Sequence, residues 1–216
     1  MGDLEPIIPS DKSIQEYLKE GKTLHQDFIP SSENPHHTVA LICSFANSEG
    51  GILIVGVNPK GKVIGVLPDA EEENIRFVVQ HYCTSQIELR FSKQTYQSKY
   101  VLLIDIPKIL NRTIAALSVN ATPHYFVRSV TGEVFEANKI IEKAWVIEKK
   151  DIDQYVLSNE AILICSSLKK QTLTISQIYK SLDLKKSLID SLLSVLISKN
   201  IVYYDFENQY IVYGLV

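Results

Sequence analysis

The sequence has no uninterrupted apolar stretch of the roughly 18 residues that a helix needs to cross a bilayer. We expect no secretory leader either, because the acidic N-terminus is broken by Pro6 and Pro9. Its three cysteines, Cys43, Cys83 and Cys165, lie far apart among apolar neighbours. This spacing predicts buried free thiols in a reducing compartment rather than a disulfide framework. We therefore expect a cytoplasmic protein with no membrane association.

The sequence also lacks an excess of basic residues. Its 22 Lys and Arg residues face 25 Asp and Glu residues, which gives a formal net charge of −3. Proteins that bind nucleic acid mainly by electrostatic attraction usually carry a clear basic excess. The charge balance argues against such a strongly electrostatic binder, while it still allows a local basic patch.

No motif for nucleotide or metal chemistry is complete. Gly50, Gly51 and Gly61 lack the Gly-x-x-x-x-Gly-Lys-Ser/Thr order of a phosphate-binding loop, and they precede a strand instead of opening a helix. His36 and His37 are adjacent, so on a helix they point in different directions, and no third ligand follows at a recognisable spacing. We expect no cofactor and no metal site.

Hydrophobic periodicity and turn signals predict a mixed first domain over residues 1–150. An amphipathic helix is expected over residues 35–47, because Asn34 and Pro35 provide a cap and a first helical position. The continuous apolar run at residues 52–57 predicts a strand that is buried on both faces. The other expected elements are helices at 13–20, from Asp69 onward and at 136–146, and strands at 23–29, 62–65, 86–93, 99–106 and 123–128. This pattern indicates an α+β domain with a mixed or antiparallel sheet.

A charged break at residues 148–151 marks the predicted start of a second domain, residues 151–216. Its expected elements are helices at 153–167, 175–181 and 185–199, followed by β-rich runs at 201–206 and 209–213. Three helices followed by a hairpin are the order of a winged helix-turn-helix domain. Because such proteins usually read two half-sites, we expect a homodimer.

The third predicted helix of this domain is the expected recognition helix. The residues expected to contact nucleic acid on it are Lys185, Lys186, Ser187 and Lys199. Asp183 and Asp190 offset this positive charge, which leaves few phosphate contacts. A protein-interaction module is therefore the alternative from another functional class.

Residues 21 to about 145 resemble the Schlafen AlbA-like domain. Three stretches carry the resemblance: residues 27–28, residues 45–51 with the strand that follows, and residues 123–128. The motif residues in the first two stretches are Asp27, Phe28, Asn47, Gly50, Gly51 and Gly56. The glycines let a helix pack closely on the buried strand, and Asn47 can cap the helix end or bond the next turn. The resemblance implies a bacterial-type transcriptional regulator that binds double-stranded DNA.

This chain departs from the family pattern at two places. Members often carry a lysine after the acidic and aromatic pair, where this chain has Ile29. Members that cut RNA hold a divalent metal with three carboxylates; Asp27 matches one and Glu20 is a candidate for a second, but Asn58 stands where the third is expected. A neutral amide is a weaker ligand for a hard cation. We therefore assign no catalytic residues, with a metal-dependent nuclease as the less favoured alternative.

The strand predicted at residues 123–128 adds two candidate contacts. Phe126 and Arg128 share one face of that strand, because side chains alternate along it. On an exposed face, Phe126 would stack on a base and Arg128 would contact a phosphate or base edge. The alternative is a core phenylalanine with an arginine that covers the core. The sequence leaves both interpretations open.

Overall fold

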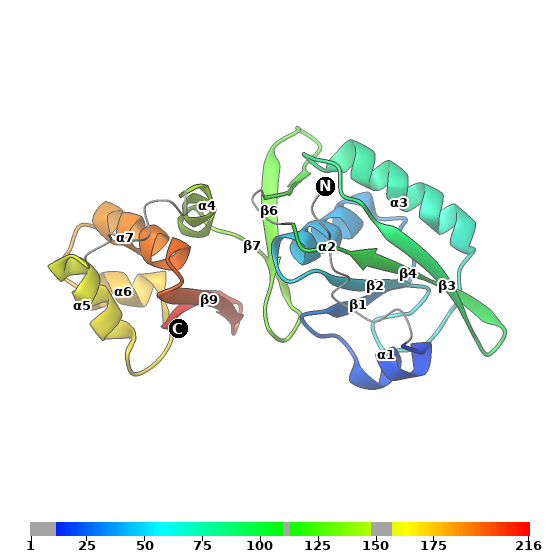
Figure 1. The fold of residues 1–216 in the computed structure, drawn as a ribbon, viewed down its shortest axis with the longest axis horizontal. Coiled ribbons are helices and arrows are strands. Elements are labelled where there is room, and N and C mark those ends of the chain that lie inside the picture. The colour runs from blue at the N-terminus through cyan, green and yellow to red at the C-terminus, as the bar shows by residue number, and fades with distance from the viewer. Residues whose placement is uncertain (1–11, 110–112, 148–156) are drawn as a thin grey trace. The chain divides into compact units, whose positions relative to one another are not determined.

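The computed structural model describes residues 12–109, 113–147 and 157–216. The chain divides into two compact units, Met1–Glu136 and Ala137–Val216 (Figure 1). Helices and mostly antiparallel sheets in both units confirm the predicted α+β class. Within the described ranges, no helix has the length and apolar character required to cross a membrane.

A four-stranded sheet forms the centre of the first unit, in the order β1-β2-β4-β3 (Figure 1). Its strands are β1 (Gln26–Ile29), β2 (Gly51–Val55), β3 (Arg90–Tyr96) and β4 (Lys99–Ile106). β1 and β2 run parallel and are connected through α2 (Pro35–Asn47), whereas the other pairs are antiparallel. β2 is buried along its whole length, as its apolar sequence predicts.

Both faces of this sheet are covered by helices. One face packs against α2 and α3 (Pro68–Tyr82), and the other packs against α1 (Ile14–Glu20). The alternation of side chains along β2 explains the division, because Leu53 lies in the α2 side of the core and Ile52 in the α1 side.

Local signals account for the ends of these helices. The Asn34 side chain accepts a hydrogen bond from the backbone N–H of His37 at the start of α2, as predicted. α3 begins earlier than expected, with Leu67 rather than Asp69 at the N-cap position, because Pro68 occupies the first helical position and its fixed φ suits that place. After α2, a Cβ on Gly51 would lie 2.5 Å from the His25 carbonyl oxygen, so only glycine fits there.

A second, three-stranded sheet completes the first unit. Its antiparallel strands are β5 (Ala115–Leu117), β6 (Pro123–Arg128) and β7 (Val134–Glu136), with β6 in the centre. β6 was predicted at these residues, whereas the short flanking strands were not. Residues 62–65 were predicted as a strand, but they contribute only an isolated bridge between Val57 and Val63.

The second unit combines four helices with a small sheet in the order β8-β10-β9 among its described residues. The elements are α4 (Lys139–Val146), α5 (Asn159–Leu168), β8 (Leu173–Thr174), α6 (Ile175–Ser181), α7 (Lys186–Ser198), β9 (Val202–Glu207) and β10 (Tyr210–Leu215). Their core gathers Ile164, Ile178, Leu193 and Tyr213, and Ile140 of α4 joins it.

α4 belongs to the second unit, whereas the sequence placed this helix in the first domain. The Asn138 amide donates to the Tyr213 hydroxyl at 2.7 Å, and the Ser194 hydroxyl donates to the Ile140 carbonyl at 2.9 Å. The contacts therefore divide the chain after Glu136, earlier than the expected boundary at residue 150, which lies outside the described residues.

Candidate functional site

Arg128 and Asp27 form a buried ion pair between β6 and β1. The Arg128 Nη2 atom lies 3.0 Å from Asp27 Oδ2 and also donates to the Thr23 carbonyl at 3.1 Å. The guanidinium carbon lies 4.0 Å from the centre of the Phe45 ring on α2. Burial lowers the pKa of the Arg128 guanidinium from its ordinary value, and the Asp27 carboxylate opposes that shift.

This geometry corrects the expected role of Arg128 in nucleic-acid binding. Its side chain is 0% exposed, so no phosphate or base can reach the guanidinium. The strand face that carries it points toward α2, and Phe126 on the same face is partly buried against that core. Of the two interpretations that the sequence left open, the structure therefore shows the one in which Phe126 packs on the core and Arg128 is not a surface contact. Arg128 instead joins two sheets.

Asn47 has a different partner from the one expected. It neither caps α2 nor bonds the adjacent turn. Its side-chain amide donates to the carbonyls of Ile114 and Phe126 at 2.7 and 3.0 Å, and its oxygen accepts from the Ile114 N–H at 2.8 Å. This motif residue thus fastens α2 to the second sheet.

An open pocket with a volume of about 470 Å³ lies beside Asp27. The end of α1, the start of β1, the first half of α2 and the turn at residues 58–61 surround it. Its polar lining consists of Lys22, Asp27, His37 and Lys60. Its apolar lining includes Leu18, Phe28, Leu41 and Pro59. Of the predicted motif residues, the structure brings Asp27 and Phe28 into this pocket.

Positive charge exceeds negative charge in the pocket. Lys22 Nζ lies 3.1 Å from Asp27 Oδ2, so two cations, Lys22 and Arg128, face a single carboxylate. Lys60 is exposed and adds a further positive charge. The Lys22 side chain is 45% exposed, so it is only partly covered by its ion pair with Asp27. The sequence did not identify Lys22 and Lys60 as site residues, because they lie far from each other in the sequence and neither belongs to a recognised motif.

The residues around the pocket do not fit a divalent metal. Both Asp27 oxygens are engaged: Oδ2 by the two cations and Oδ1 by the Phe28 backbone N–H. Glu20 pairs with Lys12 instead of facing Asp27. The Asn58 oxygen accepts from the backbone N–H groups of Lys60 and Lys62, both at 3.0 Å.

In the part of the chain that the structure describes, no three His, Cys, Asp or Glu residues are grouped so that they could hold a metal ion.

The predicted contacts on the third helix of the second unit separate into two places. Lys185, Lys186 and Ser187 are exposed together at the start of α7, and the Lys186 ammonium lies 5.3 Å from the centre of the Tyr179 ring. Lys199 is half-buried at the other end of this 13-residue helix, roughly 20 Å away at 1.5 Å per residue. A single contact therefore cannot include all four.

Asp190 is engaged within the second unit. It accepts a hydrogen bond from the Tyr179 hydroxyl, and burial together with this bond raises the pKa of Tyr179 to about 12. Part of the negative charge that was expected to offset the α7 lysines is thus turned toward a neighbouring side chain.

Comparison with known proteins gives a family match. The sequence profile of the Schlafen, AlbA_2 family matches residues 22–134, which is more than half of the chain. No curated protein matches the chain significantly.

Two solved structures resemble the chain at low identity. The DIP2311 protein from Corynebacterium diphtheriae is 16% identical with a TM-score of 0.40, over 68% of this chain and 34% of that protein. The N-terminal domain of a RecG-related protein from Nitrosomonas europaea is 15% identical with a TM-score of 0.40, over 68% of this chain and 96% of that domain. The chain thus spans about a third of the length of the DIP2311 protein.

Proposed function

Because the chain belongs to the Schlafen, AlbA_2 family, whose members generally bind nucleic acid, we propose that it binds duplex DNA and acts as a transcriptional regulator. The observation that carries the proposal beyond the family is the exposed group Lys185, Lys186 and Ser187 at the start of α7. The N-terminal residues of a recognition helix are the ones that contact base edges and nearby phosphates.

The order of elements supports a winged helix in the second unit. α5, β8, α6 and α7 are followed by the hairpin of β9 and β10, and β10 also pairs with β8 through Val212 and Thr174. In this arrangement α7 is the recognition helix and the hairpin is the wing.

The packing of α4 limits which side of α7 is open. Ser194 is buried and bonds to α4, whereas Leu188 and Ser191 are exposed on α7. The open surface therefore runs from the lysines at the helix start along Leu188 and Ser191. It carries few charges, so we expect few phosphate contacts.

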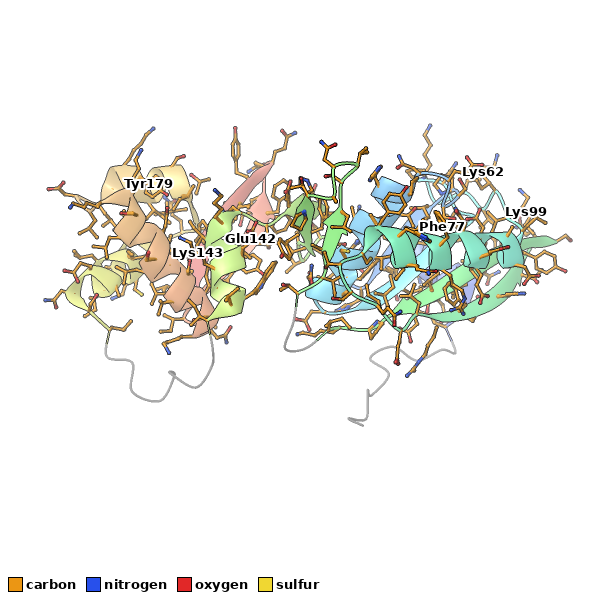
Figure 2. The ribbon with its side chains drawn as sticks, turned by 90° about the horizontal axis from the view of Figure 1, so that it is seen from above. Lys62, Phe77, Lys99, Glu142, Lys143 and Tyr179 are labelled. Atoms are coloured by element: carbon orange, nitrogen blue, oxygen red, sulfur yellow. The ribbon has the colours of Figure 1, made fainter. Side chains whose placement is uncertain are left out.

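The test is a titration of labelled duplex DNA at several salt concentrations. Each neutralised phosphate contributes about −0.9 to the slope of log K against log salt, and we expect a slope of roughly −2 to −4 per protomer. Lys185→Ala and Lys186→Ala each reduce the magnitude of this slope by about one unit and weaken all sequences alike. Lys143→Ala is the control, because Lys143 is exposed on α4, outside the helix-turn-helix (Figure 2).

The second candidate is a protein-interaction module. Ile162 and Leu163 on α5 are 47% and 50% exposed, and Leu188 on α7 is 40% exposed. Exposed apolar side chains on two helices favour contact with a protein. The absence of DNA binding at low salt by the wild-type chain would favour this candidate over the first.

We also propose that the chain forms a homodimer. Tyr203, Tyr210 and Val216 leave exposed apolar surface near the end of the chain, at 41%, 65% and 73%. Light scattering that gives twice the mass of one chain at micromolar concentration supports the dimer, and a monomer mass contradicts it.

Two further proposals concern chemistry and compartment. We propose that the protein does not cleave nucleic acids, because Asp27 is held by two cations and Asn58 serves a turn. Manganese-dependent RNA cleavage that disappears in Asp27→Ala would contradict this. A cytoplasmic location is supported by the free thiols of Cys43 and Cys83, whose sulfur atoms lie 3.8 Å apart without forming a disulfide.

A further inference from the structure

We propose that the pocket beside Asp27 binds a small organic phosphate, of about the size of a nucleoside monophosphate, without a metal ion. This inference concerns the first unit and does not depend on DNA binding by the second. Four observations support it: the net positive charge of the pocket, its mixed lining, its volume, and the way in which its charged residues are held.

The positive charge is placed where a metal would otherwise be expected. Lys22 Nζ lies 3.1 Å from Asp27 Oδ2, so an ammonium group occupies the cation position next to this carboxylate. Arg128 on the other side of Asp27 balances the negative charge, so Lys22 is the uncompensated charge of the trio. An ammonium group donates up to three hydrogen bonds, and those that Asp27 does not accept are available to a phosphate oxygen.

Lys60 supplies a second cation from a different element. The Asn58 side chain accepts from the N–H groups of Lys60 and Lys62, and the Gly61 N–H donates to the Asn58 carbonyl at 2.9 Å. These bonds fix the turn that carries Lys60 beside the pocket. Asn58, which stands where a metal-binding carboxylate was expected, thus positions a residue that favours an anion.

The start of α2 adds a third favourable contribution. His37 lines the pocket from the first turn of this 13-residue helix, and its ring offers a hydrogen-bond donor. The positive end of the helix dipole favours a bound anion in the same region.

The apolar lining indicates that the ligand has an organic part. Leu18, Phe28 and Leu41 provide a surface that a bare phosphate ion would leave uncovered. The volume of about 470 Å³ falls in the range of roughly 300–1,000 Å³ that is typical of small-molecule sites. A duplex contacts proteins through its outer backbone and grooves, so a concave site of this size suits a small ligand better than DNA.

The test measures binding of adenosine 5′-monophosphate, ribose 5-phosphate and inorganic phosphate to the full chain by calorimetry, in EDTA. We expect at least one of the two phosphate esters to bind, more tightly than inorganic phosphate, and adenosine without phosphate not to bind. Loss of a charge-assisted hydrogen bond in Lys60→Ala weakens this binding about tenfold. Lys62→Ala is the matched control, because Lys62 is an exposed lysine of the same turn that does not line the pocket (Figure 2).

Three results would overturn the proposal. They are no binding of any of the three phosphate probes at millimolar concentration, binding that Lys60→Ala and Lys62→Ala weaken equally, and binding that requires added Mg²⁺ or Mn²⁺. A second experiment adds duplex DNA as competitor. Displacement of the bound ester by DNA, lost in Lys60→Ala, would mean that the pocket serves the DNA backbone and would also overturn the small-ligand assignment. A folded Lys60→Ala protein is expected, because the Lys60 side chain is exposed and the turn is held by the Asn58 side chain and backbone N–H groups, which the substitution leaves in place.

Discussion

Breaking the ion pair of Asp27 and Arg128 is expected to destabilise the first unit. Removal of one partner from a buried ion pair typically costs about 3–5 kcal/mol, because the remaining charge stays buried without compensation. Asp27→Asn leaves the Arg128 guanidinium with a side chain that is 0% exposed and with no carboxylate beside it. We therefore expect a loss toward the upper end of that range.

Arg128→Met is expected to cost less than Asp27→Asn. The Asp27 carboxylate then keeps Lys22, 3.1 Å away, as a partner that reaches solvent. The loss also includes the hydrogen bond to the Thr23 carbonyl and the contact with the Phe45 ring. Lys22→Met, as the control, removes a half-exposed partner and should cost less than about 1 kcal/mol.

Hydrogen exchange of the slowest amides in β1 and β2 measures these losses in the first unit. Trp145 is the only tryptophan of the sequence and lies in α4 of the second unit. The urea midpoint of the unfolding transition that its fluorescence reports should therefore be the same in all three variants as in the wild type. The reasoning fails if Arg128→Met leaves exchange in β1 and β2 unchanged while it weakens DNA binding, because Arg128 would then be a surface contact.

Three further predictions concern the stability of the first unit and are checked by hydrogen exchange or denaturant unfolding. Gly51→Ala should prevent stable folding, because its Cβ would lie 2.5 Å from the His25 carbonyl oxygen. The control Gly61→Ala meets no atom within 4 Å and should cost only the roughly 1–2 kcal/mol of its positive φ, so equal losses of stability in the two variants would contradict the clash. Asn47→Ala should cost roughly 1–3 kcal/mol for each buried group left without a partner at Ile114 and Phe126, and a loss well under 1 kcal/mol would show that water replaces the amide. Burial raises the pKa of Asp105, so the folded state binds its proton more tightly than the unfolded state, and the protein loses stability as pH rises from the unfolded to the folded pKa of this group. Asp105→Asn should therefore stabilise the protein at pH 7 and have little effect below the unfolded pKa. A variant that is less stable than wild type at pH 7 would contradict this direction.

The elements with strong local signals were predictable from the sequence. α2 has a capping Asn34, a first-position Pro35 and apolar side chains at helical spacing, and it begins where the sequence places it. β2 is a continuous apolar run and lies in the centre of the sheet with both faces covered. Each of these signals is contained within a few residues, so no knowledge of the tertiary structure is needed to interpret it.

Features that depend on distant partners were not predictable. Alternation along residues 123–128 assigns Phe126 and Arg128 to one face, but it does not tell which face α2 will cover. The partner of Arg128 lies 101 residues away in the sequence. A carboxylate at position 27, directly before the apolar Phe28 and Ile29, was the one available signal that a buried cation must lie nearby.

The unit to which α4 belongs was hidden for the same reason. Residues 139–146 form an amphipathic helix whichever core they join, and the charged run that follows them suggested a boundary. The hydrogen bonds of Asn138 and Ser194 that place α4 in the second unit connect residues 75 and 54 positions apart.

Asp27 joins the two properties of the first unit, its stability and the charge of its pocket. Its carboxylate oxygen Oδ2 pairs with both buried Arg128 and half-exposed Lys22, so the same group links β1 to β6 and places a cation at the pocket. Exposure then determines what each substitution can affect. Arg128 contributes to folding and, by balancing Asp27, to the net charge beside the pocket, although its buried side chain cannot touch a ligand. Lys22 contributes to pocket charge with a small effect on folding, and exposed Lys60 to binding alone. A carboxylate that two cations already neutralise has little affinity left for a metal ion, and the positive charge that remains favours an anionic ligand.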